Sequence, residues 1–265
     1  MMMQFLRKDI DIISAFAYKE LIERIRMNPI GFLGVLAEPF MVVAGFMAVR
    51  LLFGFKGIDG MDALLFLGSG CMLFFLFKRV ALGALGGVSR RDRSLLTLRR
   101  VKPIDLVLGR GLVEVQIYSS CMLLLVVGLS FVRWQPLADN PGAAILVFLM
   151  AAGTALGISI TAFVVGHRLP PVKFLARLVI SRVLFWTSGL FFSAALLPDN
   201  VRSLLLWNPL LHAIELFRHY LQPRYPIPGI SVGYLAAWTF GSLGLSLLLY
   251  ENNEDILLEN QGDEP

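Results

Sequence analysis

The sequence predicts an all-α polytopic membrane protein with six transmembrane helices. Of its 265 residues, 57% are hydrophobic and only 16% are charged. The mean hydropathy of +0.71 is far above that of a soluble domain of this length. The apolar residues also gather into runs long enough to cross about 30 Å of hydrocarbon. These observations exclude a soluble protein, and no basic face indicates binding of nucleic acid.

The segment 89–102, SRRDRSLLTLRRVK, decides the orientation of the chain. Six of its fourteen residues are basic, and it lies between two long apolar runs. Under the positive-inside rule, a short connection this rich in Arg and Lys stays in the cytoplasm. The N-terminal segment and the later connection GHRLPPVK carry five and two further bases, whereas the opposite segments carry one, one and three. We therefore expect both termini to be cytoplasmic.

An amphipathic helix is predicted before the first span. Between residues 8 and 27, apolar residues recur every three or four positions while charged residues occupy the other faces. Because it carries charges throughout, this helix cannot cross the membrane, and we expect it to lie along the cytoplasmic interface within residues 1–29. The start of the chain also lacks the apolar core of a cleavable signal, so we expect the N-terminus to be retained.

The membrane domain is predicted over residues 30–250. Its six spans are expected at residues 30–53, 61–88, 103–131, 141–165, 174–197 and 230–250. An acidic cytoplasmic tail with six carboxylate side chains then occupies residues 251–265.

Charged and small residues within the spans predict local features. A kink is expected near Glu38, because a proline follows it. Arg110 and Glu114 lie four residues apart in the third span and are expected to neutralise each other. Gly153 and Gly157 share this spacing in the fourth span, which predicts close packing against a neighbouring helix.

Residues 201–221 are expected to enter the membrane without crossing it. The stretches 201–207 and 209–221 are apolar, but each is too short to cross about 30 Å of hydrocarbon. Asn208 and Pro209 separate them, and Pro209 suits the first position of the second helix. The sequence therefore predicts a re-entrant helical pair between spans five and six.

The sequence contains no catalytic signature that we could identify. It lacks the phosphate-binding pattern GxxxxGK[ST] and the patterns HExxH and GxSxG. His212, Glu215 and His219 share one helical face, but the two histidines are about 10 Å apart along the axis, so no metal site is expected. Cys71 and Cys121 fall in apolar spans and are expected to be buried thiols. We therefore expect no enzymatic activity from this chain.

Three stretches carry a resemblance to a known family. Residues 19–40, KELIERIRMNPIGFLGVLAEPF, have an interfacial helix that leads through Gly and Glu-Pro into the first span. Two further stretches are LFFLFKRVALGALGGVSRRDRSLLTLRRVKPIDLVLGRGLVE at residues 73–114 and WNPLLHAIELFRHYL at residues 207–221. In order and spacing they resemble ABC-2 type permeases, and among these the capsular polysaccharide exporters of KpsM, BexB and CtrC type. The resemblance covers nearly the whole chain.

This resemblance implies the transmembrane subunit of an ATP-driven exporter with the ABC-2 (type V exporter-like) fold. Such a subunit acts as a homodimer with two copies of a cytoplasmic ABC ATPase of KpsT type. ATP and Mg bind to that ATPase, so no cofactor is expected on this chain. The implied cargo is a lipid-linked acidic capsular polysaccharide, passed to a periplasmic co-polymerase of KpsE type and an outer-membrane channel. The implied location is the bacterial inner membrane.

Three other kinds of function stay open at this point. An ABC-2 exporter of O-antigen, teichoic acid or a drug would share most of these features, and an ion channel would share some. A membrane-embedded glycosyltransferase acting on a lipid carrier would need acidic residues at a membrane face. The inside connections show only Asp92 and Asp105 among many bases.

Three sets of residues are candidates for the transport function. The predicted substrate path combines cations, which attract an acidic polymer, with aromatic rings, which pack against sugars. Its residues are Lys78, Arg79, Phe74, Phe75, Phe77, Arg177, Arg182 and Trp186. The predicted ATPase-coupling surface consists of the two cytoplasmic segments with apolar edges, the helix at residues 8–27 and the loop at residues 90–100. It contains Glu20, Arg24, Arg90, Arg91, Arg93, Leu95, Leu96 and Arg99. The polar residues of the re-entrant segment give an outer gate formed by Trp207, Asn208, Pro209, His212 and Glu215.

Each set has a simpler interpretation. Lys78 and Arg79 could reach the membrane surface or pair internally instead of lining a path. The aromatic residues could be ordinary lipid or core contacts. The basic segment 89–102 could rest on anionic headgroups. The re-entrant segment could be a static plug that shapes the outer vestibule.

Overall fold

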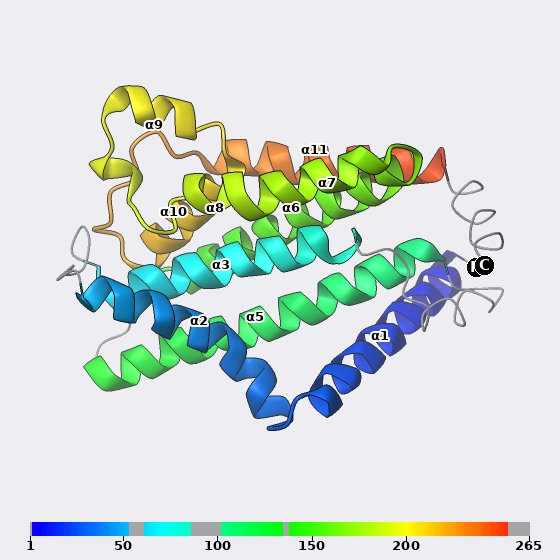
Figure 1. Cartoon of the computed structure of the whole chain (residues 1–265), viewed down its shortest axis with the longest axis horizontal. Helices are drawn as coiled ribbons and strands as arrows, with labels where there is room; N and C mark the ends of the chain where they lie inside the picture. The colour runs from blue at the N-terminus through cyan, green and yellow to red at the C-terminus, as the bar shows by residue number, and fades with distance from the viewer. Residues whose placement is uncertain (1, 53–60, 86–101, 135–137, 254–265) are drawn as a thin grey trace.

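The computed structural model describes residues 2–52, 61–85, 102–134 and 138–253. These residues form a bundle of helices (Figure 1). Five of the described helices are long and apolar enough to cross a membrane, namely α2 (Phe32–Leu52), α3 (Ala63–Gly83), α5 (Pro103–Arg133), α6 (Pro141–Arg168) and α11 (Val232–Glu251). The predicted class of all-α polytopic membrane protein is confirmed.

The predicted fifth span is built from three short segments instead of one long helix. Helix α7 (Pro170–Leu178), the π-helix η1 (Val179–Val183) and α8 (Leu184–Thr187) follow one another without a gap. This path ends at Thr187, and the chain is irregular until the 3₁₀ helix η2 (Ala194–Leu196). The predicted helix at residues 174–197 therefore ends early. A sixth crossing of the membrane stays a prediction.

Two short helices occupy the predicted re-entrant region. They are α9 (Asp199–Leu205) and α10 (Pro209–Leu221), and Asn208 separates them from each other. Helix α10 packs among α3, α6 and α11. In Figure 1 both short helices lie at the end of the bundle opposite the start of α1 and the end of α11.

Local chemistry explains where the helices begin. Side-chain oxygens accept hydrogen bonds from free N–H groups in the first turns of four helices, and these oxygens belong to Asp62, Asn140, Asn208 and Ser231. Pro103 and Pro209 occupy the first positions of α5 and α10, as predicted. At the start of α5, the Asp105 carboxylate also accepts a hydrogen bond of 2.8 Å from the Lys102 N–H.

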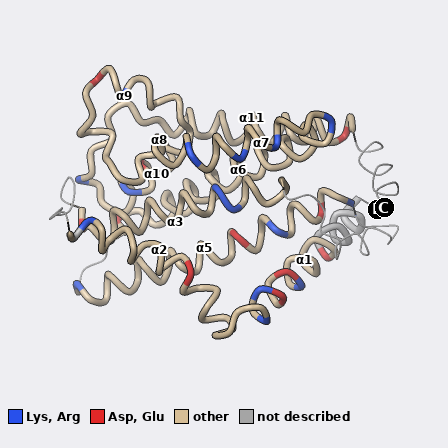
Figure 2. Tube along the Cα trace, viewed as in Figure 1, with Lys and Arg blue, Asp and Glu red and all other residues tan. Residues whose placement is uncertain are grey.

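Helix α1 (Met2–Met27) packs against α5 and carries charges of both signs (Figure 2). Its contact with α5 is close, because a Cβ atom added at Gly109 would lie 2.6 Å from a ring carbon of Phe16. Because of its charges, α1 is not expected to cross the membrane. It lies against the side of the bundle, in contact with α5.

The close approach of α6 to α11 depends on two glycines, as their spacing predicted. A Cβ atom at Gly157 would lie 2.6 Å from the Ser242 carbonyl carbon, and one at Gly153 would lie 3.0 Å from Thr239 Cγ2. Between them, the hydroxyls of Thr154 and Thr239 share a hydrogen bond of 2.9 Å. The prediction of close packing at this face is confirmed.

Substitution of Gly157 by Ala should lower the stability of the protein by roughly 1–3 kcal/mol, because the new methyl group would overlap backbone atoms of α11. Gly128→Ala is the matched control, since no atom lies within 4 Å of a Cβ atom there. Thermal unfolding in detergent measures both variants. Equal unfolding temperatures for the two variants would contradict the packing argument.

Candidate functional site

Aromatic rings from α2, α3 and the segment after η1 form one cluster. Its members are Phe46, Phe74, Phe75, Phe185, Trp186 and Phe191. The Phe185 ring is central, with centroids 5.3 Å from Phe74, 5.3 Å from Phe191 and 5.2 Å from Trp186, all in edge-on geometry. Phe74 is buried whereas Trp186 is 66% exposed. The aromatic cluster therefore extends from the core to the surface.

The structure brings three of the predicted path residues, Phe74, Phe75 and Trp186, into this cluster. Phe77 lies separately in the hydrophobic core, where it is almost completely buried. The other three rings of the cluster were missed by the sequence analysis. No pattern in the sequence indicates which helices become neighbours. The only signal for these three rings is the large number of Phe residues in the chain.

Basic residues of α3 lie beside the aromatic cluster. The Lys78 ammonium group is 5.8 Å from the centroid of the Phe75 ring, a distance typical of a cation–π contact. Arg79 forms an ion pair with Glu38 of α2, and both side chains are about half exposed. For Arg79, the structure thus supports internal pairing.

Arg177 and Arg182 are exposed on α7 and η1. Within the part of the chain that the structure describes, neither arginine has an ion-pair partner. Arg182 lies in the π-helix, a local widening that often occurs at functional sites in other proteins. No sequence pattern predicted this widening.

The predicted cations and rings follow the same spatial order on two antiparallel segments. Along α3, Phe74 and Phe75 precede Lys78 and Arg79, whereas along α7, η1 and α8 the arginines precede Phe185 and Trp186. Because the two segments run in opposite directions (Figure 1), the cations lie toward one end of the bundle on both, and the rings lie toward the other.

Glu114 of α5 pairs with Arg24 of α1. The Arg24 Nη2 atom lies 2.8 Å from Glu114 Oε1, and the Arg24 Nε atom lies 3.4 Å from Glu20 Oε1. Burial opposes the charge on Arg24, but the hydrogen bond and the charge of Glu114 outweigh it and raise the Arg24 pKa above its ordinary value. The predicted pairing of Glu114 with Arg110 is wrong. Helix α1 covers this face of α5.

Arg110 donates a hydrogen bond of 3.4 Å to the Gly83 carbonyl oxygen at the end of α3. Of the predicted coupling residues, the structure describes Glu20 and Arg24. The other predicted coupling residues lie outside the described residues, and they are Arg90, Arg91, Arg93, Leu95, Leu96 and Arg99.

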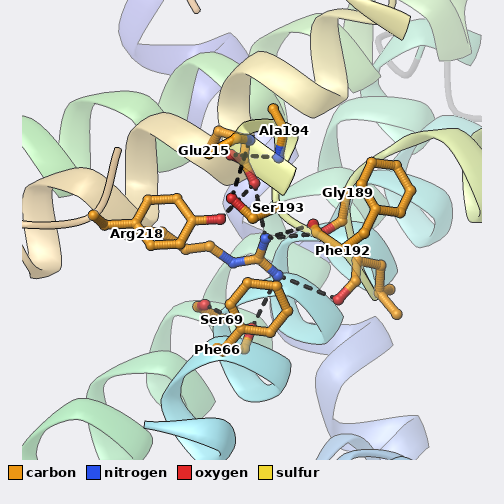
Figure 3. A network of polar contacts seen from close by, with 11 residues as sticks. Phe66, Ser69, Gly189, Phe192, Ser193, Ala194, Glu215 and Arg218 are labelled. Carbon is orange, nitrogen blue, oxygen red and sulfur yellow. Dashed lines mark hydrogen bonds and ion pairs between the residues drawn. The ribbon is translucent and has the colours of Figure 1, made fainter. Parts of the chain in front are cut away.

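Arg218 of α10 is the centre of a completely buried polar network (Figure 3). Its guanidinium group donates hydrogen bonds of 2.7 Å to Gly189 O, 3.2 Å to Leu190 O and 3.0 Å to Phe66 O. It also lies 3.5 Å from the centroid of the Phe66 ring. Glycine is needed at position 70, because a Cβ atom there would lie 2.6 Å from Arg218 Nη2. Arg218 thus joins α10 to α3 and to the irregular segment after α8.

Glu215 is the acidic partner in this network. Its carboxylate accepts hydrogen bonds of 3.0 Å from Arg218 Nη1, 2.8 Å from the Tyr225 hydroxyl and 3.2 Å from the Ala194 N–H. The α10 network therefore consists of Glu215, Arg218 and Tyr225 with the carbonyl groups they contact. Over residues 2–52, 61–85, 102–134 and 138–253, no group of three His, Cys, Asp or Glu side chains is arranged to bind a metal ion.

The remaining residues of the predicted gate differ in exposure. His212 is buried and accepts a hydrogen bond of 3.0 Å from the Ser231 N–H at Nδ1, so its Nε2 carries the proton and donates to Leu206 O at 2.8 Å. The Asn208 amide donates to the Thr187 hydroxyl at 3.0 Å. Trp207 is 78% exposed. The hydrogen bonds of Asn208 and His212 therefore hold the start of α10 in place, whereas Trp207 lies at the surface.

Replacement of Arg218 by Met should destabilise the protein by about 3–5 kcal/mol, because Glu215 would stay buried without a cation. The double variant Glu215→Gln, Arg218→Met should recover part of this loss. Thermal unfolding in detergent measures both. Asp199→Asn, which removes the exposed partner of Arg202, is the control and should leave the unfolding temperature unchanged. A double variant less stable than Arg218→Met would refute the network's ionic character.

Comparison of the sequence finds relatives among polysaccharide transport and export proteins. No protein-family model matches the chain. The chain is 27% identical over 249 residues to the polysialic acid transport protein KpsM of Escherichia coli, a match that covers 93% of this chain and 95% of that protein. It is 24% identical over 241 residues to the capsule polysaccharide export inner-membrane protein BexB of Haemophilus influenzae, covering 91% and 90%.

A third relative is the capsule polysaccharide export inner-membrane protein CtrC of Neisseria meningitidis serogroup A. It is 25% identical over 207 residues, which cover 78% of this chain and 77% of CtrC. BexB and CtrC are named as inner-membrane proteins of capsule polysaccharide export and KpsM as a polysialic acid transport protein, and the resemblance predicted from the sequence is thereby confirmed. This chain is a homologue of these transport and export proteins.

Proposed function

We propose that this chain is the transmembrane permease subunit of an ATP-driven exporter that moves lipid-linked capsular polysaccharide across the inner membrane. The similarity to KpsM over 93% of the chain carries this proposal. It extends through the membrane helices and the α10 region, and therefore includes every candidate site described above. The family resemblance implies that a separate ABC ATPase with bound ATP and Mg supplies the energy.

A homodimer would provide the path for the polymer. The interior of the bundle is filled by large side chains such as Phe66, Phe74 and Phe77, which are completely buried. A polysaccharide therefore needs a path along the outside of one bundle, closed by a second copy. The face formed by α2, α3 and the segment of α7, η1 and α8 suits this role, because it carries Lys78, Arg182 and the aromatic cluster.

The order of groups on this face suits an acidic polymer. Cations at one end would attract its carboxylates or phosphates, and the rings beyond them would pack against the apolar faces of sugars. We infer that the end with the cations faces the cytoplasm, since the basic segment 89–102 joins α3 to α5 there. Both chain termini would then be cytoplasmic.

We further propose that α1 and segment 89–102 form the surface that contacts the ATPase. Helix α1 carries exposed charges and lies at the side of the bundle, and segment 89–102 is basic with an apolar edge. At the opposite end, α9 and α10 would form a re-entrant pair. The extensive bonding of α10 favours a static plug there, with any gating motion confined to α9 and Trp207.

Export of polymer in cells tests the proposed function. A capsule-forming strain that lacks its own permease should regain surface polysaccharide only when this chain and its cognate ATPase are expressed together. An ATPase with its phosphate-binding lysine replaced is the control and should restore nothing. Normal membrane levels of both proteins without any surface polymer would contradict the proposal.

The accessibility of path residues makes a second test. Lys78→Cys and Arg182→Cys should react with a polar thiol reagent in membranes, because the proposed path contains water. The native Cys71 and Cys121 are buried, so the wild-type protein supplies the background reaction. The readout is mass spectrometry of the labelled protein. Complete protection of both introduced cysteines would contradict a water-filled path at this face.

A further inference from the structure

Charged side chains from four helices meet where α1 joins the membrane helices. Arg24 from α1, Glu38 from α2, Arg79 from α3 and Glu114 from α5 line one pocket of about 250 Å³, together with Tyr118. We call the four charged residues the inner cluster. Arg24 is one of the residues predicted for ATPase coupling and Arg79 one of those predicted for the substrate path, and the structure brings these two residues into one pocket.

The inner cluster contains two ion pairs, and each pair joins two helices. Arg24 and Glu114 connect α1 to α5 with a separation of 2.8 Å, and Arg79 and Glu38 connect α3 to α2. The charge of Glu114 also acts on Arg79 across the pocket. Glu114 thus interacts electrostatically with both arginines, although it bonds directly to Arg24.

The two carboxylates differ in access to solvent. The side chain of Glu114 is 8% exposed, whereas that of Glu38 is 55% exposed. A carboxylate with little access to water needs a cation nearby, because loss of its partner leaves a buried charge uncompensated. Glu38 lies within two turns of the start of α2, in a pocket also lined by Asn28 and Pro29, so water at the membrane surface can hydrate it, and hydrated pairs contribute little to stability. Glu38 can therefore lose its arginine at much lower cost than Glu114.

Displacement of α1 would carry Arg24 away from Glu114, which is fixed in α5. Arg79 is the other cation that lines the pocket, and its present partner Glu38 can be hydrated. We propose that Glu114 is a positioning residue for transport, which exchanges its ion-pair partner Arg24 for Arg79 when α1 moves. The Arg79–Glu38 pair is then lost, and α3 is released from α2. This inference rests on the proposed function, because it takes α1 as the helix that the ATPase displaces.

The exchange would act directly on the proposed path. Arg79 is adjacent in α3 to Lys78, whose ammonium group contacts the Phe75 ring of the aromatic cluster. Release of the Arg79–Glu38 pair removes a connection between α2 and α3, two helices that contribute rings to that cluster. A movement of α1 at the side of the bundle thereby reaches the face where polymer would pass.

Distance measurements in the complete complex with its ATPase test this exchange. Spin labels at Tyr18 of α1 and Leu112 of α5, both exposed, should show one separation without nucleotide and a second population with ATP. In Arg79→Gln, the separation without nucleotide should be unchanged but the ATP-dependent population should be lost. A purely structural clamp between Arg24 and Glu114 would leave that population intact, and this result would overturn the proposal.

Export measurements complete the test. Glu114→Gln should reduce surface polymer at least tenfold while ATP hydrolysis continues. Asp139→Asn is the control, because this exposed carboxylate lies in the connection before α6, outside the proposed path and outside the surface proposed to contact the ATPase. Wild-type export by Glu114→Gln would overturn the proposal. If this variant does not accumulate in membranes, the distance measurement on Arg79→Gln decides alone.

Two kinds of failure can be separated. A wild-type complex that exports polymer but shows a single, ATP-independent distance would overturn the exchange and leave the proposed function intact. A wild-type chain that neither binds an ATPase nor exports polymer would overturn the proposed function, and the exchange with it.

Discussion

Arg218 makes the irregular backbone after α8 compatible with a membrane domain. Carbonyl groups outside a helix have no intrahelical donor, and hydrocarbon supplies none, so such backbone is tolerated only where protein groups satisfy it. One buried guanidinium group donates to Gly189 O, Leu190 O and Phe66 O, and Glu215 compensates its charge. These bonds hold α10 against α3 and against the irregular segment after α8.

The same network limits which elements can move. Helix α10 is tied to α3 through Arg218 and to the Tyr225 hydroxyl through Glu215. Displacement of α10 would break several charge-assisted hydrogen bonds at once, each stronger than a neutral one. In α9, Arg202 donates hydrogen bonds of 2.9 Å to Ala194 O and 2.8 Å to Leu197 O, both in the segment just before the helix, and Leu204 and Trp207 are largely exposed. Motion at this end of the bundle is therefore more readily accommodated by α9.

Two further ion pairs connect neighbouring helices. The Arg24–Glu114 pair is mostly buried and holds α1 against α5, whereas the Arg79–Glu38 pair is half exposed and connects α3 to α2. This difference makes one pair a firm attachment and the other a weak one. The weak pair lies beside Lys78 and the aromatic cluster, at the face proposed to carry the polymer.

The sequence by itself determined five of the apolar spans, the helix start at Pro209 and the close packing at Gly153 and Gly157, but not the broken fifth span. These features follow from hydropathy, proline and capping residues, and residue size, all of which act within a few positions of the chain. The family resemblance also came from the sequence, and with it the expected cargo and energy source.

Only the tertiary structure decided which charges pair and which rings meet. Glu114 pairs with Arg24 instead of Arg110 because α1 folds back over α5, and no local spacing contains that information. The aromatic cluster includes Phe46, Phe185 and Phe191 because α2, α3 and α8 become neighbours. Arg218, thirty-one positions after the end of α8, donates hydrogen bonds to the irregular backbone that follows this helix. Local patterns specify a helix and its apolar face, but the partner of a side chain depends on which helix packs beside it.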